Sequence, residues 1–238
     1  VLSEIQRYIN SSDPNVLCIL GAGGSGKSSL MAKAIELAHN DNKEAHIVFR
    51  FIGITPDASN DYTMLKSLFS EISRRYKDEE EVPIGYHELA TNFINLIENA
   101  TSEYPLIIFL DALDQLTSQQ RVESLPWIPE TLPDNVRIIL TTRPGDLAQK
   151  LDERSAQIIE LEGLSKNDGN ILLEKWLRSV NRTLQESQRN SVLEQFVDSE
   201  GNPLFLKIAF EEVSRWESAE GELLIKLGED VPGIIKNN

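Results

Sequence analysis

The 238-residue sequence has little cysteine, no long hydrophobic run and no visible secretory leader. Its one cysteine, Cys18, cannot form an internal disulfide, and its place in the apolar run 16–20 predicts a buried thiol. A thiol without a partner fits a cytoplasmic protein. No apolar run approaches the roughly 20 residues that cross a bilayer, so the sequence predicts no membrane span. Because the chain begins at Val1 rather than Met, we expect it to be a piece of a longer protein.

Basic residues are also in short supply. Lys and Arg total 23 against 38 Asp and Glu, which gives a formal net charge of −15. Such a balance opposes sequence-independent binding to nucleic acid, which depends on clustered basic side chains. It does not oppose the binding of a nucleotide, because backbone N–H groups and one lysine can hold phosphates locally. The acidic run 78–81 is expected to be a solvated loop.

Short apolar runs alternate with amphipathic segments through the first two thirds of the chain. Five runs predict buried strands, and they span residues 16–20, 46–51, 106–110, 136–140 and 157–161. They are nearly continuous rather than alternating, as in parallel sheets that are covered on both faces. Segments with helical spacing span residues 28–39, 61–76 and 86–99. This alternation predicts an α/β fold with a doubly wound parallel sheet.

The pattern changes after Leu161. Three amphipathic segments follow, over residues 167–180, 184–197 and 203–216, and no strand pattern returns. We therefore predict a first domain over residues 1–162 and a small helical domain over residues 163–238.

The segment that follows the first predicted strand has the pattern G-x-x-x-x-G-K-[ST] and opens a helix. Glycines let the backbone fold closely around an anion, the N–H groups then point inward, and the helix N-terminus adds positive charge. Lys27 is expected to contact the β- and γ-phosphates, and the Ser28 hydroxyl is expected to ligate Mg²⁺. The predicted nucleotide-binding residues of this loop are Gly21, Ala22, Gly23, Gly24, Ser25, Gly26, Lys27, Ser28 and Ser29. The alternative is a glycine-rich turn with an incidental lysine.

Two acidic residues follow the third predicted strand. Asp111 comes directly after the apolar run, at the sheet edge where the phosphate loop is expected, and it is predicted to hold Mg²⁺ through water. Asp114 is predicted to orient or activate the attacking water. The alternatives are a helix cap for Asp111 and a loop residue without function for Asp114.

An arginine follows the fourth predicted strand in the segment Thr141-Thr142-Arg143-Pro144. The carboxyl ends of parallel strands meet at one edge, so Arg143 is expected near Lys27 and Asp111. A guanidinium there could sense the γ-phosphate and stabilise charge during transfer. The alternative is a surface arginine in a turn that begins at the proline.

In this order, G-A-G-G-S-G-K-S, L-D-A-L-D-Q-L, T-T-R-P and G-N-P-L resemble the signal-transduction ATPases with numerous domains, the STAND class. Within that class the chain is similar to the NACHT group, especially to members that carry WD40 repeats, over about residues 10–215. The resemblance implies a P-loop NTPase sheet followed by a small helical domain. It also implies an ATP/ADP-controlled switch that governs oligomerisation, with Arg143 as a sensor and Pro203 packed against adenine. A plain helix-start proline is the alternative for Pro203.

The sequence departs from the family pattern at several positions. Ala112 and Leu113 precede the second acid, and Gln115 fills a position that is often acidic, so hydrolysis is expected to be slow. The family also has a winged-helix histidine that contacts nucleotide. The chain's three histidines lie too early to supply it, at His39, His46 and His87.

A regulatory ATPase switch with Mg²⁺ and ATP or ADP is the leading functional hypothesis. Its expected partners are a second copy of the chain or other domains of the full-length protein. An AAA+-type DNA-linked ATPase and a non-catalytic scaffold that keeps nucleotide bound remain alternatives, and a small-molecule kinase is less favoured because no arginine-rich lid is evident. ATP is preferred over GTP from the resemblance and from the absence of an N-K-x-D segment.

Overall fold

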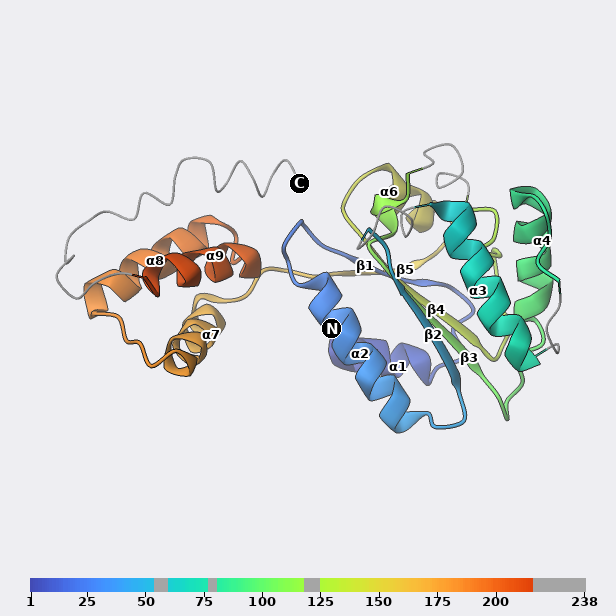
Figure 1. The fold of residues 1–238 in the computed structure, drawn as a ribbon, viewed down its shortest axis with the longest axis horizontal. Helices are drawn as coiled ribbons and strands as arrows, with labels where there is room; N and C mark the ends of the chain where they lie inside the picture. Colours follow the sequence, from blue (N-terminus) through green and yellow to red (C-terminus); the bar gives the residue numbers. More distant parts are fainter. Residues whose placement is uncertain (54–59, 77–80, 118–124, 216–238) are drawn as a thin grey trace. The chain divides into compact units, whose positions relative to one another are not determined.

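Five parallel strands form one sheet in the computed structural model, which describes residues 1–53, 60–76, 81–117 and 125–215. The order across the sheet is β2-β3-β4-β1-β5 (Figure 1). The strands are β1 Leu17–Leu20, β2 His46–Phe51, β3 Leu106–Asp111, β4 Val136–Thr142 and β5 Gln157–Glu160. All five lie within a residue or two of the predicted runs, and the doubly wound α/β fold is confirmed.

In the inner strands β1, β3 and β4, residues alternate between two covered faces, which explains why these runs are mostly apolar. The edge strand β2 is partly exposed, and the edge strand β5 has no buried residue, so the prediction of a buried strand is wrong for β5. In β3 every residue is buried, with Ile108 and Leu110 on one face and Ile107 and Phe109 on the other. In Figure 1 the helices α1 and α2 lie on one side of the sheet, and α3 and α4 lie on the other. Burial on both faces is the condition under which continuous apolar strands form a parallel sheet.

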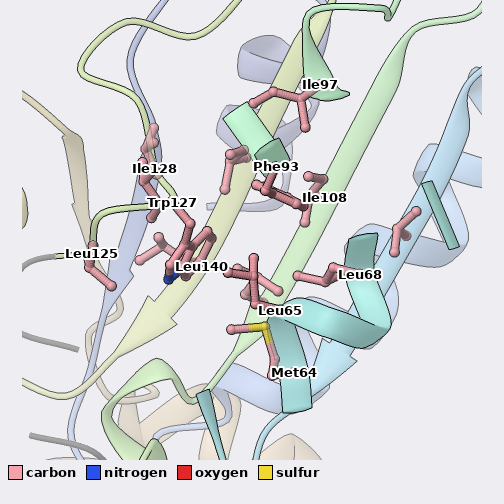
Figure 2. Packing of buried hydrophobic residues seen from close by; sticks show 14 of the residues in the cluster. Met64, Leu65, Leu68, Phe93, Ile97, Ile108, Leu125, Trp127, Ile128 and Leu140 are labelled. Carbon is pink, nitrogen blue, oxygen red and sulfur yellow. The ribbon is translucent and has the colours of Figure 1, made fainter. Parts of the chain in front are cut away.

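The larger core lies between the sheet and the α3–α4 pair. Figure 2 shows Leu65 and Leu68 of α3 and Phe93 of α4 packed towards Ile108 and Leu140 of the strands. Trp127, from the segment before β4, meets Phe93 edge to face with ring centroids 6.0 Å apart. Aromatic pairs of this geometry add about 0.5–1.5 kcal/mol beyond the area that they bury. This core anchors the strands whose ends form the site.

The helices around the sheet are α1 Leu2–Ile9, α2 Lys27–Asp41, α3 Asp61–Tyr76, α4 Tyr86–Ile97 and α6 Asp146–Glu153. The predicted segments 28–39, 61–76 and 86–99 match α2, α3 and α4, whereas α1 and α6 were not predicted. The helix α1 is tied to the sheet through Tyr8, whose hydroxyl donates to the carbonyl oxygen of Ile138 at 3.2 Å. Most of the acidic run 78–81 lies outside the described residues.

The remaining helices are α7 Lys166–Ser179, α8 Glu186–Asp198 and α9 Pro203–Val213. They share a second core that includes Leu173, Phe196 and Leu206. Gly169 lies so close to the ring of Phe196 that a Cβ there would overlap it, which explains a glycine inside a helix. The predicted segments 167–180, 184–197 and 203–216 match these helices, except that Trp216 lies outside the described residues.

The chain divides into two compact units. One holds Val1–Gly21 and Lys27–Glu160, and the other holds the short segment Ala22–Gly26 together with the chain from Leu161 onward. The sequence-based domain boundary between residues 162 and 163 stays a prediction.

Candidate nucleotide-binding site

The carboxyl ends of β1, β3 and β4 meet at one edge of the sheet because the strands are parallel. Gly21 follows β1, Asp111 ends β3 and Thr142 ends β4. In doubly wound sheets, ligands bind outside this edge where the strand order reverses. Here the chain leaves β1 for the far strand β2 and later returns to pair β4 and β5 with β1 on either side.

The glycine-rich loop lies between β1 and α2, as predicted. Gly24 and Gly26 have φ angles of 75° and 94°, in the left-handed region that glycine adopts at little cost. The N–H of Ser25 donates to the carbonyl oxygen of Ala22 at 3.2 Å and closes a tight turn. The Ser25 hydroxyl is buried and has no hydrogen-bond partner among the described residues. A buried polar group without a partner is costly, so the loop fits a ligand that supplies one, such as a phosphate.

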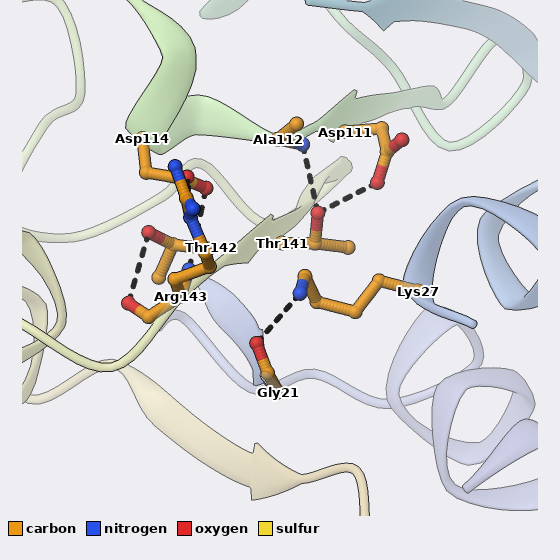
Figure 3. A network of polar contacts seen from close by, with 8 residues as sticks. All are labelled: Gly21, Lys27, Asp111, Ala112, Asp114, Thr141, Thr142 and Arg143. Atoms are coloured by element: carbon orange, nitrogen blue, oxygen red, sulfur yellow. Dashed lines mark hydrogen bonds and ion pairs between the residues drawn. The ribbon is translucent and has the colours of Figure 1, made fainter. Parts of the chain in front are cut away.

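Lys27 begins α2 and is only 9% exposed. Its Nζ donates to the carbonyl oxygen of Gly21 at 2.6 Å (Figure 3). Burial lowers the pKa of Lys27 below its ordinary value, while the nearby carboxylates of Asp114 and Asp111 oppose that shift. A partly desolvated ammonium group at the positive end of a helix favours the binding of an anion.

Ser28, Asp111 and Thr141 form a hydrogen-bonded group beside this lysine. The Ser28 hydroxyl donates to Asp111 Oδ2 at 2.5 Å, and the Thr141 hydroxyl donates to Asp111 Oδ1 at 2.7 Å. Asp111 is 4% exposed and Thr141 is fully buried. A hydroxyl and a carboxylate offer the oxygen atoms that Mg²⁺ prefers, so Ser28 and Asp111 fit the predicted metal site.

Asp114 and Arg143 form an ion pair at the same edge. Asp114 Oδ2 accepts the Nε–H of Arg143 at 2.6 Å, and Asp114 Oδ1 accepts its backbone N–H at 3.2 Å. The pair arises because Ala112 adopts the left-handed conformation, with φ of 59°, and leads into the 3-10 helix η2 Leu113–Gln115. Asp114 is 15% exposed and Arg143 is 41% exposed, so the guanidinium remains partly accessible.

The predicted residues of the first unit are therefore brought together. The electrostatic neighbours of Lys27 include Asp111, Asp114 and Arg143, and Figure 3 shows all four around the ends of β3 and β4. Ser29 lies on the first turn of α2 and is exposed. The roles assigned to these residues in nucleotide and metal binding stay predictions.

The G-N-P-L segment begins α9 within the second unit. Asn202 is the N-cap: its Oδ1 accepts the N–H of Leu204 at 2.9 Å, and its Nδ2 donates to the carbonyl oxygen of Gly23 at 2.8 Å. Pro203 occupies the first turn of the helix, where a missing N–H is tolerated. The packing of Pro203 against adenine stays a prediction.

Sequence reasoning did not assign a role to two buried residues of this region, Thr141 and Asn202. Both stand in segments that were recognised, T-T-R-P and G-N-P-L, within two positions of a residue that was assigned. Their nearness in sequence to Arg143 and Pro203 was the available signal, but the partners of Thr141 and Asn202 are 30 and 179 positions away in the chain.

Comparison with known proteins agrees with this arrangement. The family model of the NACHT domain matches residues 15–180. The chain belongs to the NACHT family. NACHT domains are P-loop NTPases, and this domain is accordingly a nucleotide-binding module. The predicted resemblance to the NACHT group is thereby confirmed.

Relatives of this NACHT domain are large proteins. It is 30% identical over 233 residues to mouse NACHT and WD repeat domain-containing protein 2, which covers 91% of this chain and 13% of the mouse protein. Human NACHT domain- and WD repeat-containing protein 1 is 26% identical over 232 residues, which covers 91% of this chain and 14% of the human protein. The chain thus spans only about an eighth of these relatives.

Solved structures share the fold at low sequence identity. A Walker-type ATPase of Pyrococcus abyssi superposes with a TM-score of 0.53 at 16% identity, covering 90% of this chain and 68% of that one. Domain III of the Thermotoga maritima replication initiation protein DnaA gives a TM-score of 0.52 at 14% identity, covering 94% of this chain and 89% of that one.

None of the helices formed by the described residues has both the length and the apolar character needed to cross a bilayer.

Proposed function

We propose that this NACHT domain is the ATP/ADP-binding switch of a larger cytoplasmic signalling protein, and that it hydrolyses ATP slowly. The observation that carries the proposal is the convergence of Lys27, Ser28, Asp111 and Arg143 at one sheet edge. Each of these groups is suited to a different part of a magnesium–triphosphate ligand. The supporting physical requirement is that ATP and ADP must have different affinities for the two states of a switch.

Phosphate binding falls to the loop and to Lys27. The backbone N–H groups of the loop and the buried ammonium of Lys27 compensate the charge of the β-phosphate. Mg²⁺, when bound, neutralises phosphate charge and assists departure of the γ-phosphoryl group. Ser28 and Asp111 are the residues that would hold this ion. Ser28 would offer its hydroxyl to the ion and Asp111 would hold it through water, and the 2.5 Å hydrogen bond between them shows that the two groups are neighbours.

Arg143 is the proposed sensor of the γ-phosphate. Asp114 accepts hydrogen bonds from both the guanidinium and the backbone N–H of this residue, which restricts the movement of the side chain. A charge-assisted hydrogen bond to a phosphate contributes about 1.5–3 kcal/mol. This hydrogen bond would form with ATP and not with ADP, so it would raise the affinity for ATP over that for ADP by about 10- to 150-fold. A difference of that size is enough to shift a two-state equilibrium.

We expect hydrolysis to be slow because the site has few acidic residues that could activate water. Gln115 stands where the family often has an acid, and a neutral amide does not act as a general base. Asp114 is the remaining candidate to orient water, but its two carboxylate oxygens already accept hydrogen bonds from Arg143. Water activation and sensor placement therefore compete for one carboxylate.

Calorimetric titration of the purified chain with ATP and with ADP in Mg²⁺ tests the binding site. Lys27→Ala should lower the affinity for both ATP and ADP by at least about tenfold. The matched control is Lys33→Ala, which removes an exposed lysine of the same helix whose ion pair with Glu36 is on the surface. Equal loss in both variants, or no loss in Lys27→Ala, contradicts the assignment.

The sensor assignment has a sharper signature because it predicts a difference between two ligands. Arg143→Ala should reduce the affinity for ATP and leave that for ADP within about threefold. Arg178→Ala, which removes an arginine 79% exposed, controls for the change in net charge. An equal loss of ATP and ADP affinity in Arg143→Ala would show that the arginine does not sense the γ-phosphate.

The same purified chain can be tested for self-association and for DNA binding. Light scattering of the wild type with ATP and with ADP should report a larger assembly with one nucleotide than with the other. The neighbour DnaA is a replication initiation protein, but its 14% identity shows the fold alone. The net charge of −15 opposes a nonspecific grip on DNA, so salt-sensitive DNA binding would favour the alternative of a DNA-linked ATPase.

A further inference from the structure

Thr141 is a fully buried hydroxyl residue at the carboxyl end of β4, where its backbone pairs with Ile19 of β1. Its hydroxyl bonds to residues at the end of β3, the neighbour of β4 on its other side. Oγ1 accepts the backbone N–H of Ala112 at 2.8 Å and donates to Asp111 Oδ1 at 2.7 Å. A threonine hydroxyl carries one proton, and the N–H of Ala112 can only donate. The hydroxyl proton is therefore directed to the carboxylate.

The Thr141 hydroxyl accepts a backbone hydrogen bond just beyond the point where the β3–β4 pairing ends. The ladder between β3 and β4 ends at the pair Leu110 and Leu140. Two residues after Leu110, Ala112 is in the left-handed conformation, and its N–H donates to the side chain of Thr141. This bond secures the turn that separates Asp111 from Asp114.

Each oxygen of the Asp111 carboxylate thus has its own hydroxyl partner. Oδ1 is held by Thr141, and Oδ2 is held by Ser28 at 2.5 Å. Rotation of the carboxylate about its last torsion would break both bonds. Because Asp111 is 4% exposed, water cannot readily replace a lost partner.

We propose that Thr141 is a positioning residue for magnesium: it locks the carboxylate plane of Asp111 so that Oδ2 faces Ser28 and the ion. The inference rests on the proposed function, because it concerns the metal part of that site. Thr141 itself does not touch the ligand in this proposal. Its contribution should appear in how strongly Mg²⁺ improves nucleotide binding.

The measurement is the ADP affinity in excess Mg²⁺ divided by the affinity in EDTA, obtained by calorimetry below the unfolding temperature of each variant. Thr141→Val keeps the shape and removes the hydroxyl, and it should lower this ratio by about tenfold while the affinity in EDTA changes less than about threefold. Thr141→Ser keeps the hydroxyl and should retain the wild-type ratio. A purely structural role would lower both affinities together and leave the ratio unchanged.

Thr142→Val is the matched control. Thr142 is the next residue of β4 and is also fully buried, but among the described residues its hydroxyl donates only to the carbonyl oxygen of Arg143, at 3.3 Å. Its ratio should match that of the wild type. If Thr141→Val does not fold, Thr141→Cys carries the same test, because a thiol is a weak donor and should also lower the ratio.

Asp111→Asn separates the two levels of the argument. A low ratio in Asp111→Asn together with a wild-type ratio in Thr141→Val overturns the role of Thr141 and leaves the proposed function intact. A wild type that binds no nucleotide, or that binds it equally with Mg²⁺ and with EDTA, overturns the proposed metal site and the inference with it.

Discussion

Replacing Gly24 with alanine should impair nucleotide binding. The residue has φ of 75°, and a left-handed conformation costs an L-residue about 1–2 kcal/mol. A Cβ at this position would lie 2.6 Å from the Cβ of Leu204 and 2.8 Å from Oδ1 of Asn202. Overpacking of this kind typically costs about 1–3 kcal/mol. The loop conformation would therefore be disfavoured by about 2–5 kcal/mol.

That free energy must be recovered whenever the loop closes on a phosphate. A cost of about 2 kcal/mol corresponds to an affinity about 30-fold lower, which calorimetric titration with MgADP would resolve. Gly85→Ala is the control, because Gly85 also has a positive φ, 119°, but nothing lies within 4 Å of its added Cβ. This control should lose stability and keep its affinity for ADP. A Gly24→Ala variant that binds ADP within threefold of the wild type would refute the steric argument.

Three further changes test other parts of the account. Burial lowers the pKa of Lys27 below its ordinary value of 10.5. At pH values between the lowered pKa and 10.5, the lysine is protonated in the unfolded chain and mostly neutral in the folded chain. The free energy of unfolding therefore rises with pH in this range. In urea unfolding without nucleotide, the stability of the wild type relative to Lys27→Met should rise as the pH approaches 10.5, and a constant difference up to that pH would contradict the lowered pKa. Burial raises the pKa of the Cys18 thiol to about 12, and the side chain is fully buried. Iodoacetamide at pH 8 should therefore label this thiol only as fast as the chain opens, whereas rapid labelling of the native chain would place β1 outside the core. Gly169→Ala should overlap the ring of Phe196 and destabilise the helical unit by about 1–3 kcal/mol, seen as a lower melting temperature by circular dichroism. An unchanged melting temperature would show that α7 and α8 do not pack as described.

The strands were predictable because burial on both faces requires a continuous apolar run, which is easily recognised in the sequence. The run from Leu106 to Leu110 is apolar at every position, and the structure buries all of it. The same regularity explains why Asp111 and Arg143 could be expected at one edge, since each follows the carboxyl end of a parallel strand. Neither inference needs side-chain detail.

Two short helices were missed for a different reason. The helices α1 and α6 have only eight residues each, and α1 buries just three of them: Ile5, Tyr8 and Ile9. So few apolar positions make a weak periodic pattern. Their stability comes from tertiary contacts, such as the hydrogen bond from Tyr8 to Ile138, which the sequence does not reveal.

The partners within the site were beyond sequence reasoning. Asp114 was predicted to orient or activate the attacking water, and its ion pair with Arg143 was not predicted; the left-handed turn at Ala112 redirects the chain so that the two side chains meet. The hydroxyl of Thr141 reaches Asp111 only because β3 and β4 are neighbours in the sheet. Strand order and local turn geometry decide such contacts, and neither is encoded in the spacing of the residues.

The most direct test of the central claim is a crystal structure of the chain grown with ADP and Mg²⁺. The account predicts the diphosphate in the loop Gly21–Ser28, with Nζ of Lys27 within hydrogen-bonding distance of the β-phosphate and the ion beside Ser28 and Asp111. A diphosphate bound elsewhere, or Lys27 turned away from it, would contradict the account.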